Sequence, residues 1–343
     1  MNAGLKVVDP GLHTTVQDLG RVGYQALGVP VSGALDAVAL RLGNALVGNP
    51  AGAPALEILW SRPTLEVMAQ TVRVAVAGGG ASLSVGESGH IVPAWQSVTL
   101  PRGTVFRINL GRESVCVYLA VEGGIAVPSV LGSASTYVRA KLGGFAGRAL
   151  QRGDLVPVAL DRAPERPERR LPSPPSAAPE QPIRIVLGPQ QDYFTDASLT
   201  ALLDAEFRIS KNADRMGMRL DGPLLRHREG WDIVSDAIAT GAIQVPGSGQ
   251  PILLLADHQT TGGYPKIATV ISADLPVVGR RRPGDLIRFA AVSIEEAEQL
   301  ARDEEHRLAA RIASFEPVPE GAGIDLASLY AGNLISGVVA ATE

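Results

Sequence analysis

Short runs of β-type residues, each ended by turn residues, limit the fold of this chain more than any other feature. Before the middle of the sequence they occur at residues 5–8, 56–59, 64–68, 72–77, 97–100, 105–110, 115–121 and 155–160. After it they occur at residues 183–187, 206–209, 217–220, 243–245, 252–255, 268–271 and 286–289. The chain also has 38 glycines and 25 prolines, which suit frequent turns. This pattern predicts a sandwich or barrel.

Helical periodicity is confined to a few stretches. Apolar residues recur every three or four positions in residues 34–47, which predicts a helix there. Ser293 and Glu296 form a capping box ahead of a second periodic stretch at residues 294–313. A shorter helix is expected within residues 193–203. The predicted fold class is therefore mainly β with a few helices, arranged as two β-barrel-like domains.

A proline-rich and charged segment at residues 161–182 divides the sequence. Its composition does not favour a packed core, and proline favours extended conformations. It predicts a linker between an N-terminal β-rich domain, residues 1–160, and a C-terminal β domain, residues 183–315, closed by the last helix. Residues 316–343 are expected to form a tail. The alternative for residues 161–182 is a long surface loop inside one domain.

Composition and charge exclude several classes of function. The net charge is -4 and only 4% of the residues are aromatic, which argues against a nucleic-acid partner. No segment has the roughly 18 uninterrupted apolar residues of a membrane span, and no leader is evident, so a cytoplasmic protein is expected. The five histidines are scattered, which predicts no metal site. The one cysteine, Cys116, is expected to be buried in a strand.

The stretch from residue 241 to residue 267 combines an apolar run at residues 251–256 with many polar side chains and glycines. The apolar run predicts a short buried strand, and polar groups at the end of a rigid strand can form a site. The candidates before and after this strand are Gln244, Asp257, Gln259, Thr261 and Tyr264. The alternative is a hairpin whose polar side chains bond only to their own backbone.

A second polar cluster lies between Gly11 and Gly33. Gln17, Asp18, Arg21 and Tyr24 offer donors, an acceptor and a positive charge around a glycine-rich turn, which suits a carboxylate or amide ligand. The alternative is that these groups cap and support the helix that follows.

Two further features leave alternatives open. Arg215 could hold a carboxylate or phosphate, or it could form an ion pair that locks two domains together. Gly78, Gly79 and Gly80 could cradle an anion with backbone N–H groups, or they could form a tight turn. The glycine run is not a P-loop, since no Lys-Ser/Thr follows. Residues 280–282, three arginines, are expected in a solvated loop.

Taken together, these clusters resemble the family called allophanate hydrolase subunit 2, whose members are also known as 5-oxoprolinase C subunits or biotin-dependent carboxyltransferase-like proteins. The resemblance covers nearly the whole chain. It is carried in order by TTVQDLGRVGYQALGVPVSGALD at residues 14–36, GGGAS at 78–82, LAVEGGI at 119–125, LGSASTYVRAKLGG at 131–144, GPQQDYF at 188–194, DRMGMRLDGP at 214–223 and GAIQVPGSGQPILLLADHQTTGGYP at 241–265.

This resemblance implies a cyclophilin-like β fold. It also implies the C component of a 5-oxoprolinase, which works with A-type and B-type subunits to convert 5-oxoproline to glutamate. ATP would be used through the complex. The alternatives are a carboxyltransferase that takes a carboxyl group from carboxybiotin on a separate carrier and acts on urea or a similar amide, and a non-catalytic regulatory partner of a B-type subunit.

The resemblance and the polar clusters together assign expected roles to individual residues. The expected catalytic residues are Asp18, Arg21, Asp257 and Gln259. The expected substrate-binding residues are Gln17, Tyr24, Arg215, Gln244, Thr261 and Tyr264, and the expected cofactor-binding residues are Gly78, Gly79 and Gly80. The two clusters are expected to face each other across the two domains.

Overall fold

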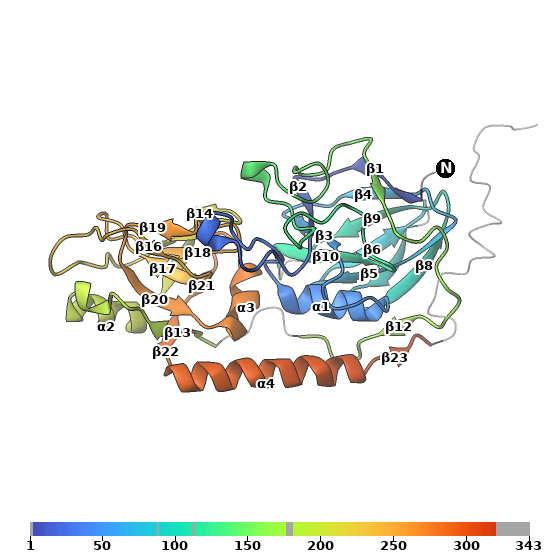
Figure 1. Cartoon of the computed structure of the whole chain (residues 1–343). Coiled ribbons are helices and arrows are strands. Elements are labelled where there is room, and N and C mark those ends of the chain that lie inside the picture. The colour runs from blue at the N-terminus through green and yellow to red at the C-terminus, as the bar shows by residue number, and fades with distance from the viewer. Residues whose placement is uncertain (1–2, 88, 112–113, 176–180, 320–343) are drawn as a thin grey trace, which may run out of the picture.

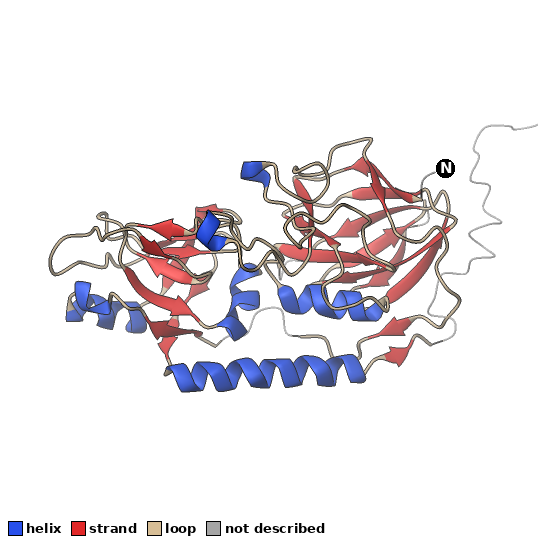
Figure 2. Ribbon diagram, in the orientation of Figure 1, coloured by secondary structure: helices blue, strands red, loops and turns tan. Residues whose placement is uncertain are grey.

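The computed structural model of the protein describes residues 3–87, 89–111, 114–175 and 181–319 (Figure 1). Within these ranges the chain forms mainly antiparallel β-sheets with four α-helices (Figure 2). The predicted mainly β fold class is confirmed. We call residues 3–175 the first half and residues 181–319 the second half. The apolar run at residues 333–340 lies outside the described residues.

Two antiparallel sheets make up most of the first half. One has the strand order β11 (Leu155–Pro157), β1 (Gly4–Asp9), β4 (Thr64–Val67), β9 (Val105–Asn109), β6 (Ser82–Val85) and β7 (His90–Pro93). The other has the order β2 (His13–Gln17), β3 (Ala55–Leu59), β10 (Cys116–Val121), β5 (Thr71–Ala77) and β8 (Ser97–Pro101). Apolar side chains from both sheets share one buried core between them.

The five-stranded sheet is buried on both faces, which explains its nearly continuous apolar sequence. Along β10, Val117 and Leu119 lie in the core between the two sheets. Their neighbours Tyr118 and Ala120 point to the opposite face and share a core with α1 (Ala37–Leu46). That second core continues into the second half of the chain, so α1 lies where the two halves meet.

The predicted helix at residues 34–47 is present, but it begins later than expected. The Asp36 side chain accepts a hydrogen bond from the Ala39 N–H at 2.9 Å, which makes Asp36 the N-cap. The predicted helix at residues 294–313 is confirmed as α4 (Ile294–Ala313), and the Ser293 side chain caps it by accepting from the Glu296 N–H. The shorter predicted helix is α2 (Asp196–Asp204).

The second half is built on one eight-stranded sheet. Its order is β21 (Leu286–Ile287), β14 (Phe207–Ala213), β15 (Gly217–Asp221), β18 (Ile252–Leu254), β17 (Ala242–Gln244), β20 (Lys266–Val270), β13 (Ile183–Leu187) and β22 (Phe289–Ala291). The two edge strands, β21 and β22, are separated in sequence by Arg288 alone, so the sheet curls into a nearly closed barrel. The predicted single strand at residues 286–289 is therefore divided between the two edges.

The remaining elements are short. The 3₁₀ turns are η1 (Gln25–Leu27), η2 (Val138–Ala140), η3 (Gln191–Tyr193) and η4 (Ser272–Asp274), and the remaining strand pairs are β16 (Asp236–Ala237) with β19 (Thr261–Gly262) and β12 (Arg169–Arg170) with β23 (Glu316–Pro317).

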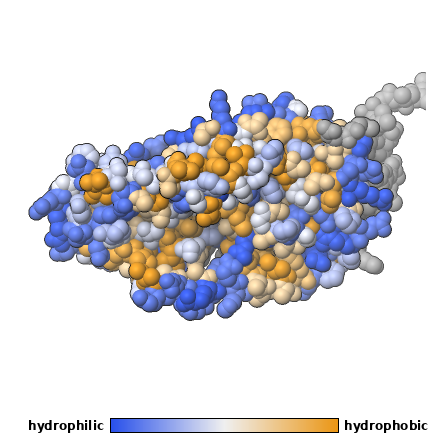
Figure 3. All heavy atoms as spheres, viewed as in Figure 1, coloured by the Kyte–Doolittle hydropathy of each residue, from blue (hydrophilic) through white to orange (hydrophobic). Residues whose placement is uncertain are grey.

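Helix α4 runs below both halves in Figure 1. Hydrophilic residues gather along this lower edge of the molecule in Figure 3, in keeping with the many exposed charged side chains of the helix. Arg41 of α1 binds Glu305 of α4 through two contacts of 2.6 and 2.7 Å. The helix therefore packs against the first half as well as the second.

Several elements were not predicted. Strands β2, β6 and β7 and helix α3 (Leu275–Gly279) are only four or five residues long, which is too short for periodicity to identify them with certainty. The expectation of a solvated loop at residues 280–282 is wrong for Arg280. Its side chain is 8% exposed, and its backbone carbonyl accepts from the Val115 N–H.

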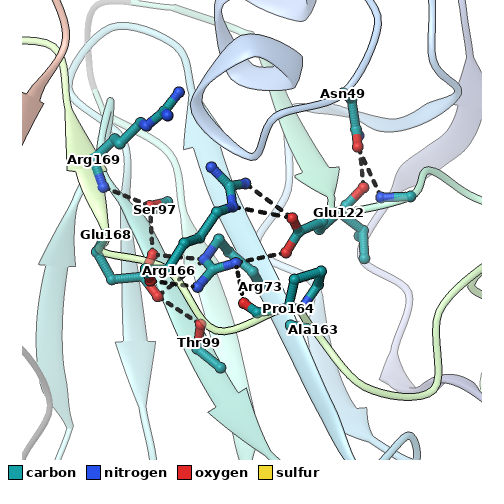
Figure 4. Close-up of polar contacts among 12 residues, drawn as sticks. Asn49, Arg73, Ser97, Thr99, Glu122, Ala163, Pro164, Arg166, Glu168 and Arg169 are labelled. Atoms are coloured by element: carbon teal, nitrogen blue, oxygen red, sulfur yellow. Dashed lines mark hydrogen bonds and ion pairs between the residues drawn. The ribbon is translucent and has the colours of Figure 1, made fainter.

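The beginning of the proline-rich segment packs on the first half instead of forming an open linker (Figure 4). Ala163 and Leu171 are buried. Glu168 accepts from the buried Arg73 Nε at 3.1 Å and from Thr99 Oγ1 at 2.5 Å, and it also binds Ser97. Composition alone misses this packing because charged side chains from distant strands supply the partners.

We expect Glu168→Ala to lower the free energy of unfolding by about 1–3 kcal/mol, because it removes a hydrogen-bonded carboxylate from the buried Arg73. Chemical denaturation measures the change. Glu165→Ala is the matched control in the same segment, since the Glu165 side chain is 91% exposed and its loss should change stability by less than about 0.5 kcal/mol. Equal effects of the two substitutions would contradict this account of the segment.

Candidate functional site

A cavity of about 460 Å³ opens beside β14, β15, β17 and β18, and one residue of the first half, Arg139, contributes to its wall. We call it the junction cavity. Strand alternation explains its position. In β15, Met218 points into the main core, whereas Arg219 points into the cavity. In β18, Leu253 likewise points into the core and Leu254 into the cavity. The cavity therefore occupies the face of the sheet opposite the main core.

Three of the predicted site residues line this cavity: Gln244, Gln259 and Tyr264. The Gln244 Nε2 donates to the Tyr264 carbonyl at 3.3 Å, and the Gln259 Nε2 donates to the Gln244 Oε1 at 3.4 Å. Gln244 is buried, while Gln259 and Tyr264 are exposed. Carboxamides provide both donors and acceptors, so this wall can bind both the N–H and the C=O of an amide.

The basic side chains of the cavity were missed by the sequence analysis. Arg139, Lys211 and Arg219 line it and are exposed, and Asp214 is the one acidic residue in the lining. The Asp214 carboxylate accepts from the Met216 N–H at 2.7 Å and lies 3.8 Å from the Arg139 guanidinium. A register shift between Ile209 and Ala213 breaks the strand alternation, so the sequence could not predict that Lys211 faces this cavity.

Behind the cavity, Arg215 joins the two halves through buried contacts. It binds both oxygens of Asp257 at 2.8 and 3.0 Å, the Gly33 carbonyl at 2.7 Å, and Glu57. Burial lowers the pKa of Arg215, but the neighbouring carboxylates of Glu57 and Asp257 outweigh it and raise the pKa above its ordinary value. Arg215 and Asp257 therefore form the locking ion pair that the sequence left as an alternative. Every charged atom of this pair is bonded within the chain, so the geometry favours this structural role over the substrate and catalytic roles expected for the two residues.

Both oxygens of the Asp18 carboxylate also accept hydrogen bonds from other groups of the chain. Its Oδ1 accepts from the Gly20 N–H and from the hydroxyl groups of Ser133 and Ser135, and its Oδ2 accepts from the Ala134 N–H. These bonds hold the loop at residues 133–135 against the end of β2. The geometry supports a positioning function for Asp18 in place of the predicted catalytic one.

Arg21 differs from Asp18, Arg215 and Asp257 because two of its nitrogens make no hydrogen bond to the described residues. It is 1% exposed and donates from Nη2 to the Ser135 carbonyl. Its Nε and Nη1 have no hydrogen-bond partner in the part of the chain that the structure describes. Burial lowers its pKa, and the charges of Asp18 and Asp257 oppose that shift. Arg21 does not line the junction cavity.

The other predicted site residues lie elsewhere. Gln17 is buried and donates to Thr15 and to the Thr136 carbonyl, Tyr24 precedes η1, and Thr261 is exposed on β19. The predicted residues Gln17, Tyr24 and Thr261 do not line the junction cavity.

Gly78, Gly79 and Gly80 follow β5 directly and form a turn. A Cβ on Gly78 would lie 2.5 Å from Val117 Cγ1, and one on Gly111 would lie 2.5 Å from Gly80. The chain itself therefore fills the space beside Gly78, and Gly111 packs against Gly80, so the geometry favours a tight turn over the cofactor-binding role predicted for this run.

Two further observations concern the residues that the structure describes. Among them no group of three or more His, Cys, Asp or Glu side chains is placed to hold a metal ion. Within the same residues, no helix combines the length and the apolar character needed to cross a membrane. Cys116 is buried in β10, and burial raises the pKa of its thiol.

His258 follows Asp257 but points to different partners. Its Nε2 lies 3.1 Å from Thr240 Oγ1, and its Nδ1 lies 2.6 Å from the Gln259 carbonyl, which accepts a hydrogen bond from Nδ1. Burial lowers the pKa of His258 below 6.5, and the bond to Gln259 opposes that shift. The folded protein therefore favours the neutral ring.

We expect the stability that neutral His258 contributes to be present above pH 6.5 and to be lost as the pH falls, because the unfolded chain binds the proton more readily. His258→Asn should reduce the acid-induced loss of stability measured by denaturation at a series of pH values. His306→Asn, at an exposed position of α4, is the control. His13 and His227 also have lowered pKa values, so the difference between wild type and variant is the informative quantity. Unchanged pH dependence in His258→Asn would contradict the prediction.

The chain is similar in sequence and structure to known proteins. The chain is 37% identical over 303 residues to the C subunit of the 5-oxoprolinase of Escherichia coli (strain K12), and the match covers 88% of this chain and 95% of that protein. The solved structure of TTHA0988 aligns with a TM-score of 0.75 and 39% identity over 84% of this chain. The present chain spans 56% of the length of that protein.

The solved structure of Kluyveromyces lactis urea carboxylase aligns with a TM-score of 0.80 and 30% identity. This alignment covers 94% of the present chain and 30% of that protein. The family model that matches is described as carboxyltransferase domain, subdomain A and B, and it covers residues 27–291. The chain therefore belongs to the carboxyltransferase domain family with subdomains A and B, in agreement with the resemblance of its sequence motifs.

Proposed function

We propose that this chain is the C subunit of a 5-oxoprolinase and that the junction cavity binds the cyclic amide on which the assembled enzyme acts. The similarity to the C subunit of the Escherichia coli 5-oxoprolinase over 95% of that protein supports the first part. The second part rests on one observation: a single cavity is lined both by carboxamides and by cations. These are Gln244, Gln259, Arg139, Lys211 and Arg219.

The chemistry of 5-oxoproline suits these lining residues. Its lactam carries one N–H donor and one C=O acceptor, which Gln244 and Gln259 can complement. Its carboxylate can be neutralised by Lys211 or Arg219, which are exposed cations of the same lining. The cavity volume of about 460 Å³ falls in the usual range for small-molecule sites. Binding and orientation are the contributions we assign to this chain.

The remaining steps are assigned to the assembled complex. The relative from Escherichia coli is named as one subunit of its enzyme, which indicates others, and we propose A-type and B-type subunits as partners. ATP would be used by the complex. Because Val117 fills the space beside Gly78, we place no nucleotide at the Gly78 to Gly80 turn.

Carboxyl transfer from carboxybiotin to urea or another small amide is the second candidate. The alignment with urea carboxylase at a TM-score of 0.80 favours it, and an amide substrate would use the same glutamines. Such a reaction requires a biotin-bearing carrier, because the carboxyl group must be delivered by another protein.

Reconstitution distinguishes these functions. The purified chain mixed with the A-type and B-type subunits from the same organism is expected to convert 5-oxoproline to glutamate with ATP, and avidin should leave the rate unchanged. Loss of activity on adding avidin would indicate carboxyl transfer. Stable assembly with the B-type subunit, without any turnover of 5-oxoproline or urea, would indicate a regulatory binding partner and contradict the enzymatic proposal.

A further inference from the structure

A second cavity, of about 340 Å³, lies between α4, α3 and the start of β13. We call it the helix cavity. It is distinct from the junction cavity, since no lining residue is shared. Its walls carry an unusual number of charged side chains, four arginines and two carboxylates: Arg184, Arg280, Arg307, Arg311, Asp274 and Glu304.

The ion pairs around the helix cavity leave positive charge in excess. Arg184 is fully paired with Asp274, at 3.1 Å from Nε and 2.5 Å from Nη2. Glu304 is shared by two arginines of the same helix, at 2.8 Å from Arg307 and 3.5 Å from Arg311. A single carboxylate therefore serves two guanidinium groups on the α4 wall.

Arg280 provides an independent sign of an incomplete site. Its side chain is only 8% exposed, and its Nε lies 3.5 Å from the Asp36 carboxylate, whose side chain is fully buried. Neither the Arg280 Nε nor the Asp36 Oδ2 makes a hydrogen bond within the described residues. A buried guanidinium held by one loose ion pair is costly unless another acceptor binds it.

We propose that the helix cavity binds a phosphoryl group, presented either as free phosphate or pyrophosphate or as the phosphate chain of a nucleotide. Guanidinium groups bind phosphate oxygens through paired, charge-assisted hydrogen bonds, and Arg280, Arg307 and Arg311 all line this one cavity. A multiply charged tetrahedral anion satisfies several such groups at once. This inference does not depend on the proposed function.

Helix α4 contributes Glu304, Arg307 and Arg311 to this cavity and is joined to α1 by the Arg41–Glu305 ion pair, so a bound anion would also fasten the helix that contacts both halves. Ligands that bind only the folded state stabilise it. We therefore expect pyrophosphate to raise the Tm of the protein.

Titration calorimetry with the full chain tests the proposal. Inorganic pyrophosphate is expected to bind with a Kd of roughly 1 mM or tighter. Phosphate and ATP form parallel arms, and tighter binding of ATP than of pyrophosphate would identify a nucleotide as the source. Succinate, a dicarboxylate of similar charge, should bind at least about tenfold more weakly.

Variants locate the binding. Arg280→Gln and Arg311→Gln should each weaken pyrophosphate binding by about tenfold. Arg311→Gln keeps the test valid if Arg280→Gln fails to fold. Arg302→Gln, on α4 with a 57% exposed side chain outside the cavity, is the matched control and should bind as wild type does.

Two results would overturn the proposal. One is the absence of pyrophosphate binding, or equal binding of succinate. The other is loss of binding in Lys211→Gln but not in Arg311→Gln, since that would place the anion in the junction cavity.

Discussion

Arg215→Met is expected to lower the free energy of unfolding by about 3–5 kcal/mol, the largest effect of any single substitution considered for this chain. The reason is that Arg215 is buried and faces Glu57 and Asp257, which are also buried. Removing the guanidinium leaves two carboxylates close together without a counter-charge. Urea denaturation of the isolated chain measures the change.

Arg139→Met is the control for this prediction. Arg139 also pairs with an acidic residue across the two halves, Asp214, but at 3.8 Å and with side chains that are 63% and 60% exposed. Its loss should change stability by less than about 1 kcal/mol. If Arg215→Met proved as stable as Arg139→Met, the buried network would not be what holds the halves together.

The second large effect concerns activity. Gln244→Leu combined with Gln259→Leu is expected to lower kcat/KM for 5-oxoproline in the reconstituted complex by about 100-fold, since two hydrogen bonds to the lactam are lost. Gln151→Leu, at an exposed position outside the cavity, should leave kcat/KM unchanged. Denaturation of the double variant checks that the fold persists. Full activity in a folded double variant would exclude the cavity as the substrate site.

Periodicity in the sequence predicted the strands and helices that are apolar and regular. The stripe and capping box of α4 led to its observed bounds, and the run that became β18 was recognised because apolar residues fill it. Strand β2 was missed because three of its four buried residues, Thr14, Thr15 and Gln17, are polar, and the carbonyl of Thr136 that binds Gln17 lies 119 positions away in sequence.

The sequence located the region of the candidate site better than it assigned individual roles. It selected Asp257 because it follows a predicted buried strand, Asp18 because it lies in a polar cluster around a glycine-rich turn, and Arg215 because a guanidinium can hold a carboxylate or phosphate. The structure shows that their charged atoms bind the chain itself. Arg215 binds Glu57, which lies 158 positions away in the sequence. No local sequence pattern reveals such a pairing.

A crystal structure of the assembled complex with 5-oxoproline tests the central claim most directly. We predict that the lactam lies in the junction cavity, with its amide against Gln244 and Gln259 and its carboxylate toward Lys211 or Arg219. The claim would be contradicted by 5-oxoproline bound entirely within another protein of the complex, or bound at Arg21 with the junction cavity empty.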